Sequence, residues 1–195
     1  MNLIERAKNI IITPAKEWDV IATETPDTGK IITGYVLPLA GAAALAAFIG
    51  YAFIARHFGG INWGIYQAIT VLVGALAGVF ISAFVIDALA PSFGSEKNMG
   101  RSIQLVAYSY TPFWVGGLLA IIPMIAFLGV LVGLYSLYLL YIGIPKLKKT
   151  PEDKQLGYFV VSLLVMIVVY FVIGFILSLI LLSSMGMTNY GRGWY

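Results

Sequence analysis

The sequence contains no cysteine, a single histidine and few charged residues, and each shortage excludes a class of protein. Without cysteine the chain has no disulfide, no thiolate metal site and no cysteine nucleophile. One histidine, His57, cannot assemble a typical zinc site. Only 11% of the 195 residues are charged and 60% are hydrophobic, far from the composition of a soluble domain. We expect no cofactor and no metal ion, and a bilayer rather than water as the solvent.

The apolar stretches also lack the paired groups that catalysis needs. They contain serine and threonine, but no histidine or lysine lies at a comparable depth to activate a hydroxyl. There is no phosphate-binding glycine loop with a Walker-type lysine. No basic stretch alternates with exposed aromatic residues as in single-stranded nucleic-acid grooves. We therefore expect neither an enzyme nor a nucleic-acid-binding protein.

Long apolar stretches are what the sequence has instead. A helix needs about 20 apolar residues to cross a hydrocarbon core about 30 Å thick. Such stretches occupy residues 31–55, 66–90, 103–122, 124–144 and 159–182. They are apolar on every face, whereas the strands of a membrane barrel alternate apolar and polar residues. The predicted fold class is all-α: a polytopic membrane protein with five transmembrane helices between residues 31 and 185.

The twelve basic residues indicate the orientation. One side of the predicted bundle receives ten of them: Arg6, Lys8, Lys16, Lys30, Lys97, Arg101, Lys146, Lys148, Lys149 and Lys154. The other side receives Arg56 and Arg192. Because lysine and arginine concentrate in cytoplasmic loops, we expect a cytoplasmic N-terminus and an extracytoplasmic tail at 186–195 in a cell (inner) membrane.

Residues 1–30 are predicted to form cytoplasmic, interfacial amphipathic helices. Asn2 can cap a first helix that carries Arg6 on its polar face, and Pro14 begins a second. Trp18 is expected at headgroup level, as are Trp63 and Trp194 near other helix ends. The alternative is that both helices pack on the inner ends of the spans, because the same apolar face serves either surface.

Small residues recur at four-residue spacing on two spans. Gly74, Gly78 and Ser82 form one such ridge, and Gly129 and Gly133 form another. These ridges let helix backbones approach closely. We expect them to pack within the bundle, and the alternative is a homo-oligomer seam.

Pro112 lies about halfway along the third span and predicts a kink. It has no N–H for the carbonyl of Tyr108, which is left seeking a partner. Tyr108, Thr111 and Pro112 share a face and form a polar notch at mid-depth. Interrupted helices mark substrate sites in transporters. The alternative is a structural kink satisfied by Thr111, by Ser109 or by a neighbouring helix.

The fourth span follows the third with little more than Pro123 between them. The two spans are therefore predicted to be antiparallel neighbours in a tight hairpin. Tyr135, Tyr138 and Tyr141 follow at three-residue steps along one side. Tyr135 is deep enough to need a partner inside the protein, whereas Tyr141 fits an interfacial aromatic belt.

Asp87 is the sole carboxylate inside a predicted span. At the bilayer centre it would cost about 2.5–3.5 kcal/mol or more. It precedes Ala90, the end of the span, by about 4.5 Å of helix, where that cost falls. We predict an interfacial carboxylate within reach of Lys97 or Arg101, and the alternative is a functional acid or ion ligand.

Several short motifs resemble the Yip family, five-span membrane proteins named for interaction with Ypt/Rab GTPases. The family's third span carries Gly-Tyr-x-x-x-Pro, which residues 107–112 match with alanine in place of glycine. Prokaryotic-type members are similar at residues 87–94, 138–145 and 149–153 as well. The candidate functional residues in these motifs are Asp87, Pro91, Gly94, Tyr108, Thr111, Pro112, Tyr141 and Pro145.

The resemblance implies a fold more than an activity. Eukaryotic relatives act in membrane trafficking through a longer N-terminal region, whose acidic, glycine-proline motif has no counterpart here, so GTPase binding is not implied. The resemblance carries over no catalytic residue. We expect a non-enzymatic protein that organises partners or lipids through its cytoplasmic face, and the alternative is a small-solute or ion permease using the kinked third span. Expected partners are membrane lipids and other membrane or cytoplasmic proteins, with no nucleic acid.

Overall fold

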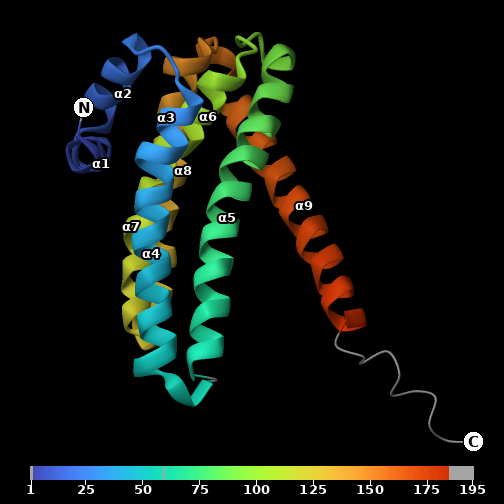
Figure 1. Ribbon diagram of the computed structural model, residues 1–195. Helices are drawn as coiled ribbons and strands as arrows, with labels where there is room; N and C mark the ends of the chain where they lie inside the picture. The colour runs from blue at the N-terminus through green and yellow to red at the C-terminus, as the bar shows by residue number, and fades with distance from the viewer. Residues whose placement is uncertain (1, 59, 185–195) are drawn as a thin grey trace, which may run out of the picture.

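The protein is helical throughout the part described by the computed structural model, which covers residues 2–58 and 60–184 (Figure 1). None of these residues lies in a β-strand, in agreement with the all-α prediction. The predicted tail at 186–195, with Trp194, lies outside the described residues.

Four helices in that part of the chain are long and apolar enough to cross a membrane: Thr28–Ile54, Gly60–Phe93, Pro123–Lys148 and Glu152–Val172. They coincide with the predicted first, second, fourth and fifth spans. The first consists of α3 (Thr28–Ile31), a π-helical turn η1 (Ile32–Val36), α4 (Leu37–Ile49) and a second π-helical turn η2 (Gly50–Ile54). The short helix η3 (Arg56–Phe58) follows it. The others are α5 (Gly60–Leu89) with η4 (Ala90–Phe93), η6 (Pro123–Ile125) with α8 (Ala126–Lys148), and α9 (Glu152–Ser184).

The third predicted span is broken. It comprises α6 (Met99–Ser109), α7 (Thr111–Gly117) and η5 (Leu118–Ile121), with Tyr110 between the first two. The break falls two residues before Pro112, so the predicted kink is confirmed. None of the three pieces alone reaches the length of about 20 residues that a straight crossing requires.

The third and fourth segments form the predicted hairpin. Gly116 on α7 and Gly129 on α8 are so close that a Cβ on Gly129 would lie 2.4 Å from the Gly116 carbonyl oxygen. Gly133 similarly faces Phe113, at 2.9 Å from a built Cβ. This ridge therefore packs inside the chain, as predicted, whereas a Cβ on Gly74 would meet no atom within 4 Å.

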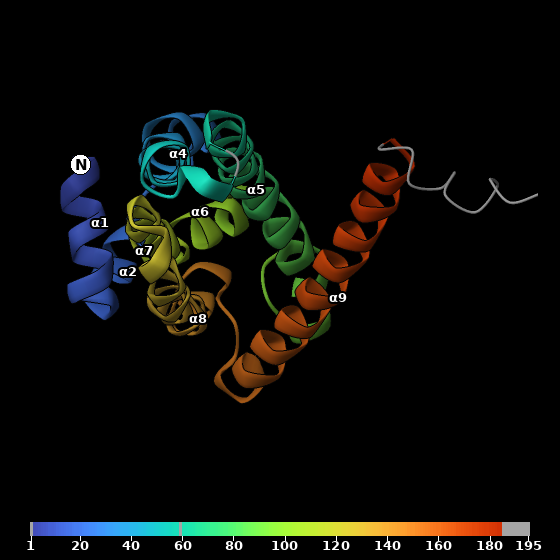
Figure 2. The ribbon, with the colours of Figure 1, turned by 90° about the horizontal axis from the view of Figure 1, so that it is seen from below.

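The N-terminal residues form α1 (Leu3–Ile12) and α2 (Pro14–Thr23). The Asn2 side chain accepts a hydrogen bond from Ile4 N, and Pro14 begins α2, both as predicted. The two helices lie beside one end of the bundle, against α7 and α8 and away from α5 and α9 (Figures 1 and 2).

Candidate functional site

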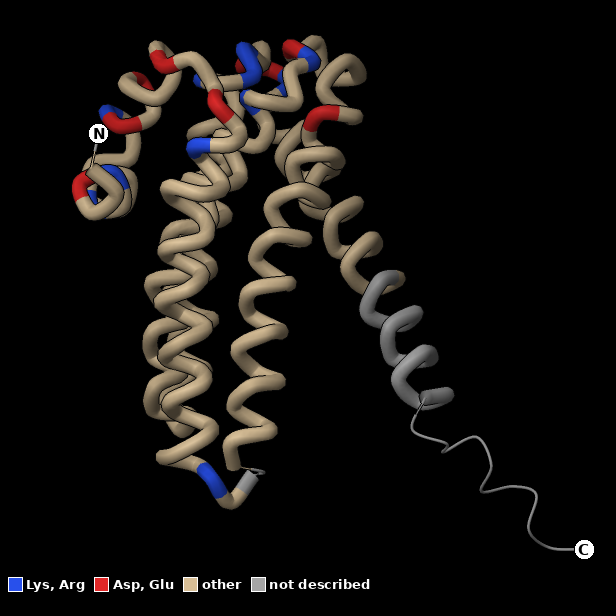
Figure 3. Tube along the Cα trace, in the orientation of Figure 1, with Lys and Arg blue, Asp and Glu red and all other residues tan. Residues whose placement is uncertain are grey.

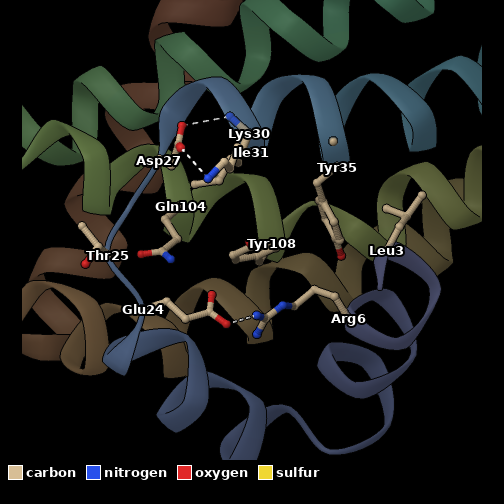
Figure 4. A pocket seen from close by; sticks show the side chains of 11 residues that line it. Leu3, Arg6, Glu24, Thr25, Asp27, Lys30, Ile31, Tyr35, Gln104 and Tyr108 are labelled. Carbon is tan, nitrogen blue, oxygen red and sulfur yellow. Dashed lines mark hydrogen bonds and ion pairs between the residues drawn. The ribbon is translucent and has the colours of Figure 1, made fainter. Parts of the chain in front are cut away.

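A polar cavity of about 410 Å³ lies where the N-terminal helices meet the bundle (Figure 4). Its walls come from α1, from the linker between α2 and α3, from the first turns of the helix that begins at Thr28, and from α6. The lining residues are Leu3, Arg6, Glu24, Thr25, Asp27, Lys30, Ile31, Gly34, Tyr35, Gln104 and Tyr108. The cavity thus joins segments that are about 100 residues apart in the sequence.

Arg6 is the most deeply enclosed charge of this cavity. Only 4% of the residue is exposed, and its guanidinium donates to Glu17 Oε1 at 2.6 Å and to Glu24 Oε1. The guanidinium also lies 5.2 Å from the centroid of the Tyr108 ring. The prediction that Arg6 lies on the polar, outer face of its helix is wrong. Glu17 on α2 and Glu24, just after α2, supply the opposite charge that a buried guanidinium requires.

Trp18 lies inside the protein. Its side chain is completely buried, and a Cβ added to Gly143 on α8 would lie 2.8 Å from the indole ring. Protein rather than lipid therefore covers Trp18, because glycine leaves a space on α8 that the indole fills; its headgroup-level depth stays a prediction. The alternative, that the N-terminal helices pack on the inner ends of the spans, is confirmed for α2. Trp63, near the start of α5, is 39% exposed, and its place at an interface stays a prediction.

The carbonyl ends of both N-terminal helices are bonded to the bundle. Tyr135 on α8 donates its hydroxyl to Ile11 O at 3.1 Å, so its predicted bond inside the protein is confirmed. Arg101 on α6 donates to Ile21 O at 3.2 Å and to Ala22 O at 3.1 Å. The last carbonyls of a helix have no partner within it, so these contacts stabilise the docked position of α1 and α2.

Gln104 and Tyr108 both line the cavity, and each carries a polar group (Figure 4). Arg101 donates to Gln104 Oε1 at 2.9 Å, which turns the Gln104 amide nitrogen the other way. Within the described part of the chain, neither this nitrogen nor the Tyr108 hydroxyl has a hydrogen-bond partner. The two residues are 1% and 7% exposed. The residues are enclosed, but neither of these two atoms is itself fully buried, so both are available to a ligand in the cavity.

Asp27 and Lys30 form the rim of the cavity. The Lys30 ammonium lies 3.4 Å from Asp27 Oδ2, and both side chains are largely exposed. Lys30 N also donates to Asp27 Oδ1 at 3.0 Å, and this backbone hydrogen bond holds the pKa of Asp27 below its usual range. The rim therefore presents one carboxylate and one ammonium side by side.

A second polar cluster surrounds Asp87 at the same end of the bundle. Its Oδ1 accepts hydrogen bonds from Lys148 Nζ at 2.9 Å, Asn98 N at 2.7 Å and Ser102 Oγ at 3.1 Å. Lys148 Nζ also donates to Ser102 Oγ and to Asn98 O, and its side chain is completely buried. This cluster joins the ends of α5 and α8 to the beginning of α6.

The predicted partners of Asp87 are wrong. Neither Lys97 nor Arg101 pairs with it, since Arg101 bonds the end of α2. The partner is Lys148, 61 residues further along the chain. Sequence reasoning missed it because the fold, and not proximity in the chain, brings the two helix ends together. The sequence did contain a signal for this pair: Lys148 lies at the end of the fourth span, and Asp87 lies at the end of the second span on the same side of the predicted bundle.

Pro91 and Gly94 shape the exit from α5. Pro91 lies in the short helix η4, and Gly94 ends it with a left-handed φ of 65° that favours glycine. The loop then meets the segment after α8, where Ser95 Oγ lies 2.8 Å from Thr150 Oγ1 and Glu96 N donates to Lys148 O. Residues 87–94 and 149–153, noted as separate motifs, thus belong to one folded unit.

Pro112 and Pro145 each free one carbonyl, and each carbonyl has a partner. Thr111 Oγ1 donates to Tyr108 O at 2.7 Å, which confirms the alternative of a structurally satisfied kink. Gln155 Nε2 donates to Tyr141 O at 2.9 Å, four residues before Pro145. The carbonyl that each proline leaves without its helical partner is therefore hydrogen-bonded to a side chain of the protein.

The predicted polar notch beside Pro112 is filled. Tyr35 Oη lies 2.6 Å from Thr111 Oγ1, and Thr111 is completely buried. Tyr108 lines the cavity described above, but Pro112 and Asp87 do not. The structure thus brings Tyr108, Thr111 and Pro112 together and leaves Asp87 in its own cluster.

Hydrogen-bond donors and acceptors both line the cavity. It offers an amide N–H, a tyrosine hydroxyl, one exposed ammonium and two carboxylates. In the part of the chain described, no three histidine, aspartate or glutamate side chains lie where they could hold a metal ion. A polar molecule or headgroup with both donor and acceptor groups would match this lining.

Comparison with known proteins agrees with the motifs and the helical fold. The inner membrane protein YohC of Escherichia coli strain K12 is 29% identical over 155 residues, covering 74% of this chain and 80% of the relative. The inner membrane protein YohC of Escherichia coli O6:H1 matches with the same figures. No solved structure matches. A family model of the Yip1 domain matches residues 8–176, and this chain therefore belongs to the Yip1 family.

Proposed function

We propose that this protein is a non-enzymatic inner-membrane protein that organises lipids or partner proteins through its cytoplasmic face. The observation that carries the proposal is the polar cavity between the N-terminal helices and the bundle, into which Gln104 and Tyr108 present polar groups without partners in the described chain. A buried ion pair joins α1 to α2, and hydrogen bonds tie the ends of both helices to the bundle. A membrane anchor needs no such fixed position.

The proposal includes a topology of five crossings with the N-terminus in the cytoplasm. The broken segment from Met99 to Ile121 is the third crossing, since it runs beside α8 over the length of the bundle (Figure 1). Lysine, arginine and the acidic residues gather at the end that carries α1 and α2 (Figure 3), whereas Arg56 lies in η3, the connection between η2 and α5 at the other end. The excess of basic residues supports a cytoplasmic location for the cavity.

The enclosure of the Asp87–Lys148 pair supports a non-enzymatic role. Asp87 and Lys148 neutralise each other at 2.9 Å, and Lys148 is completely enclosed. A general acid or base must reach the proton that it transfers, and this pair is not open to a substrate.

Crosslinking in native membranes tests the proposal. A photoreactive amino acid at Thr25, which lines the cavity, should capture a reproducible lipid or protein by mass spectrometry. The matched position is Phe127, which is 63% exposed on α8 far from the cavity and should capture bulk lipid alone. Identical products from both positions would contradict the proposal.

A second candidate, a small-solute or ion permease, is favoured by one observation. Three hydroxyls meet inside the bundle beside the break at Tyr110: Ser82 Oγ lies 2.6 Å from Tyr110 Oη and 3.0 Å from Tyr170 Oη. Flux in proteoliposomes that Asp87→Asn or Tyr108→Phe abolishes would support transport. Wild-type protein without flux, together with specific capture at Thr25, would favour the organising role.

A further inference from the structure

The charges at the cavity include no surplus of cations, which restricts the ligand that it can hold. Two cations, Arg6 and Lys30, line it together with two carboxylates, Glu24 and Asp27. Glu17 adds a further negative charge on the far side of Arg6, at 2.6 Å. An anion would therefore find no surplus of positive charge, and a zwitterion would find a partner for each of its charges.

The unpaired donors fit the negative part of a zwitterion. Gln104 Nε2 and the Tyr108 hydroxyl face the cavity without partners, and Lys30 stands at its rim. The three can donate to the oxygens of a phosphate diester, because such oxygens are strong hydrogen-bond acceptors. Glu24 and Asp27, on the linker side, accept from N–H groups of an ammonium.

The aromatic rings argue for a primary ammonium. A quaternary ammonium is usually held over open ring faces. Here the Arg6 guanidinium already lies over Tyr108 at 5.2 Å, and Tyr35 meets Tyr108 edge to face at 4.7 Å. The groups of the cavity that can still bind a cation are carboxylate oxygens, and a primary ammonium binds these through its N–H groups.

The position of the cavity favours a lipid over a soluble molecule. Its lining from Lys30 to Tyr35 belongs to the first turns of a helix suited to cross the membrane. From Thr28 to Tyr35 the helix rises about 10 Å, which overlaps a headgroup layer of roughly 5–8 Å on each side of the hydrocarbon core. Gly34, which also lines the cavity, has open space beyond its Cα.

Apolar surface continues from the cavity toward the hydrocarbon. Ile4 and Ile12 on α1 are 73% and 65% exposed, and Leu37 is exposed one turn beyond Gly34. A headgroup in the cavity could therefore leave its acyl chains along Gly34 and Leu37, in contact with lipid. The volume of about 410 Å³ lies in the range of small-ligand sites.

We propose that this cavity binds the headgroup of a zwitterionic phospholipid with a phosphate diester and a primary ammonium, as in phosphatidylethanolamine. The proposal rests on the proposed function, since it names the lipid that the cytoplasmic face would hold.

Lipid selection by the full-length protein tests it. The protein is placed in nanodiscs of equal parts phosphatidylethanolamine, phosphatidylcholine and phosphatidylglycerol, released, and its bound lipid identified by native mass spectrometry. We expect phosphatidylethanolamine to be enriched about fivefold or more over the other two. A hydrogen bond to the phosphate contributes about 1 kcal/mol, so Tyr108→Phe should reduce the amount of bound lipid about fivefold, without changing the preference among the three lipids. Tyr138→Phe, which removes an exposed hydroxyl from α8, should leave that amount unchanged.

A charge-altered variant examines the ammonium directly. Glu24→Gln with Asp27→Asn keeps Glu17 on Arg6 and leaves the cavity with a net positive lining, so bound lipid should shift toward phosphatidylglycerol. Retained preference for phosphatidylethanolamine in this variant would overturn the proposal. So would equal binding of the three lipids by the wild type.

A soluble competitor distinguishes the source of the headgroup. Glycerophosphoethanolamine carries the same two charges without acyl chains and should compete weakly. If glycerophosphoethanolamine displaces the lipid at equal concentration, the ligand is a soluble molecule and not a lipid. The assignment of a phosphate diester with a primary ammonium would still hold. Capture of another lipid or a protein at Thr25 without any preference for phosphatidylethanolamine would overturn this inference alone, and the proposed function would stand.

Discussion

Asp87 and Lys148 lie 2.9 Å apart where two long helices end, and Lys148 is completely enclosed by protein. Removing such charges from water costs several kcal/mol per ion, which their attraction and the bonds to Asn98 and Ser102 must offset. The network fixes the relative position of α5, α6 and α8 rather than adding much net stability. A single truncation should therefore be more damaging than removal of both charges.

Lys148→Met should destabilise the protein by about 3–5 kcal/mol, because it leaves the Asp87 carboxylate buried and unpaired. The double variant Asp87→Leu with Lys148→Met should lose less than the single one. Lys149→Met is the matched control, since Lys149 pairs with Glu96 on the surface and should cost less than about 1 kcal/mol. Thermal unfolding in detergent measures all three. A double variant less stable than Lys148→Met would contradict this account.

Gly143 offers a second test at the scale of single residues. A Cβ there would lie 2.6 Å from Leu105 and 2.8 Å from the Trp18 ring, whereas a Cβ on Gly74 meets nothing within 4 Å. Gly143→Ala should therefore cost about 1–3 kcal/mol by overpacking. Gly74→Ala should be neutral or slightly stabilising, since alanine is the better helix former. Equal melting temperatures for the two variants would show that Trp18 does not fill this space.

At the scale of elements, α1 and α2 form a unit that can open without unfolding the bundle. Specific contacts to it come from the Arg6 guanidinium over Tyr108, Trp18 against Gly143, the Lys146–Asp19 ion pair, and the bonds from Tyr135 and Arg101. Regions held by few buried contacts open at lower free energy than the global unfolding of a protein. Damage to the Arg6 cluster should therefore appear as local opening.

Arg6→Met leaves Glu17, which is 4% exposed, without its partner. Hydrogen exchange measured by mass spectrometry should then rise by roughly tenfold or more along residues 3–23, since even about 1.4 kcal/mol changes an opening equilibrium tenfold. Exchange in α8 should not change. Lys8→Met, at an exposed position of the same helix, serves as the control. Uniform faster exchange through the whole bundle would refute an independent N-terminal unit.

The elements were more predictable than the contacts between them. Hydropathy and the cap residues Asn2 and Pro14 are local signals, and they placed the helices because helix formation depends on near neighbours. The break before Pro112 was predictable for the same reason. The surroundings of Trp18 and Arg6 were not predictable because they come from Gly143 and Glu17, and an apolar face does not reveal whether lipid or protein will cover it.

At the scale of the whole molecule, both polar clusters lie at one end. The cavity and the Asp87 network are linked by α6, which supplies Gln104 and Tyr108 to one and Ser102 to the other. Within the described residues, the opposite end shows little charge (Figure 3), and the connection there holds Arg56 in η3. If the broken third segment crosses the membrane, the cavity and the Asp87 network lie on the same side of it.

Cysteine accessibility can decide that topology, because the chain has no cysteine of its own. Lys97→Cys and Met124→Cys bracket the broken segment, and Met124 is 87% exposed. With five crossings and a cytoplasmic N-terminus, a membrane-impermeant maleimide added to intact cells should label Met124→Cys and Arg56→Cys. Lys97→Cys should react after the membrane is permeabilised. Labelling of positions 97 and 124 from the same side would mean that α6 and α7 enter the membrane without crossing it, and the cavity and the end of α8 would then no longer share a cytoplasmic face.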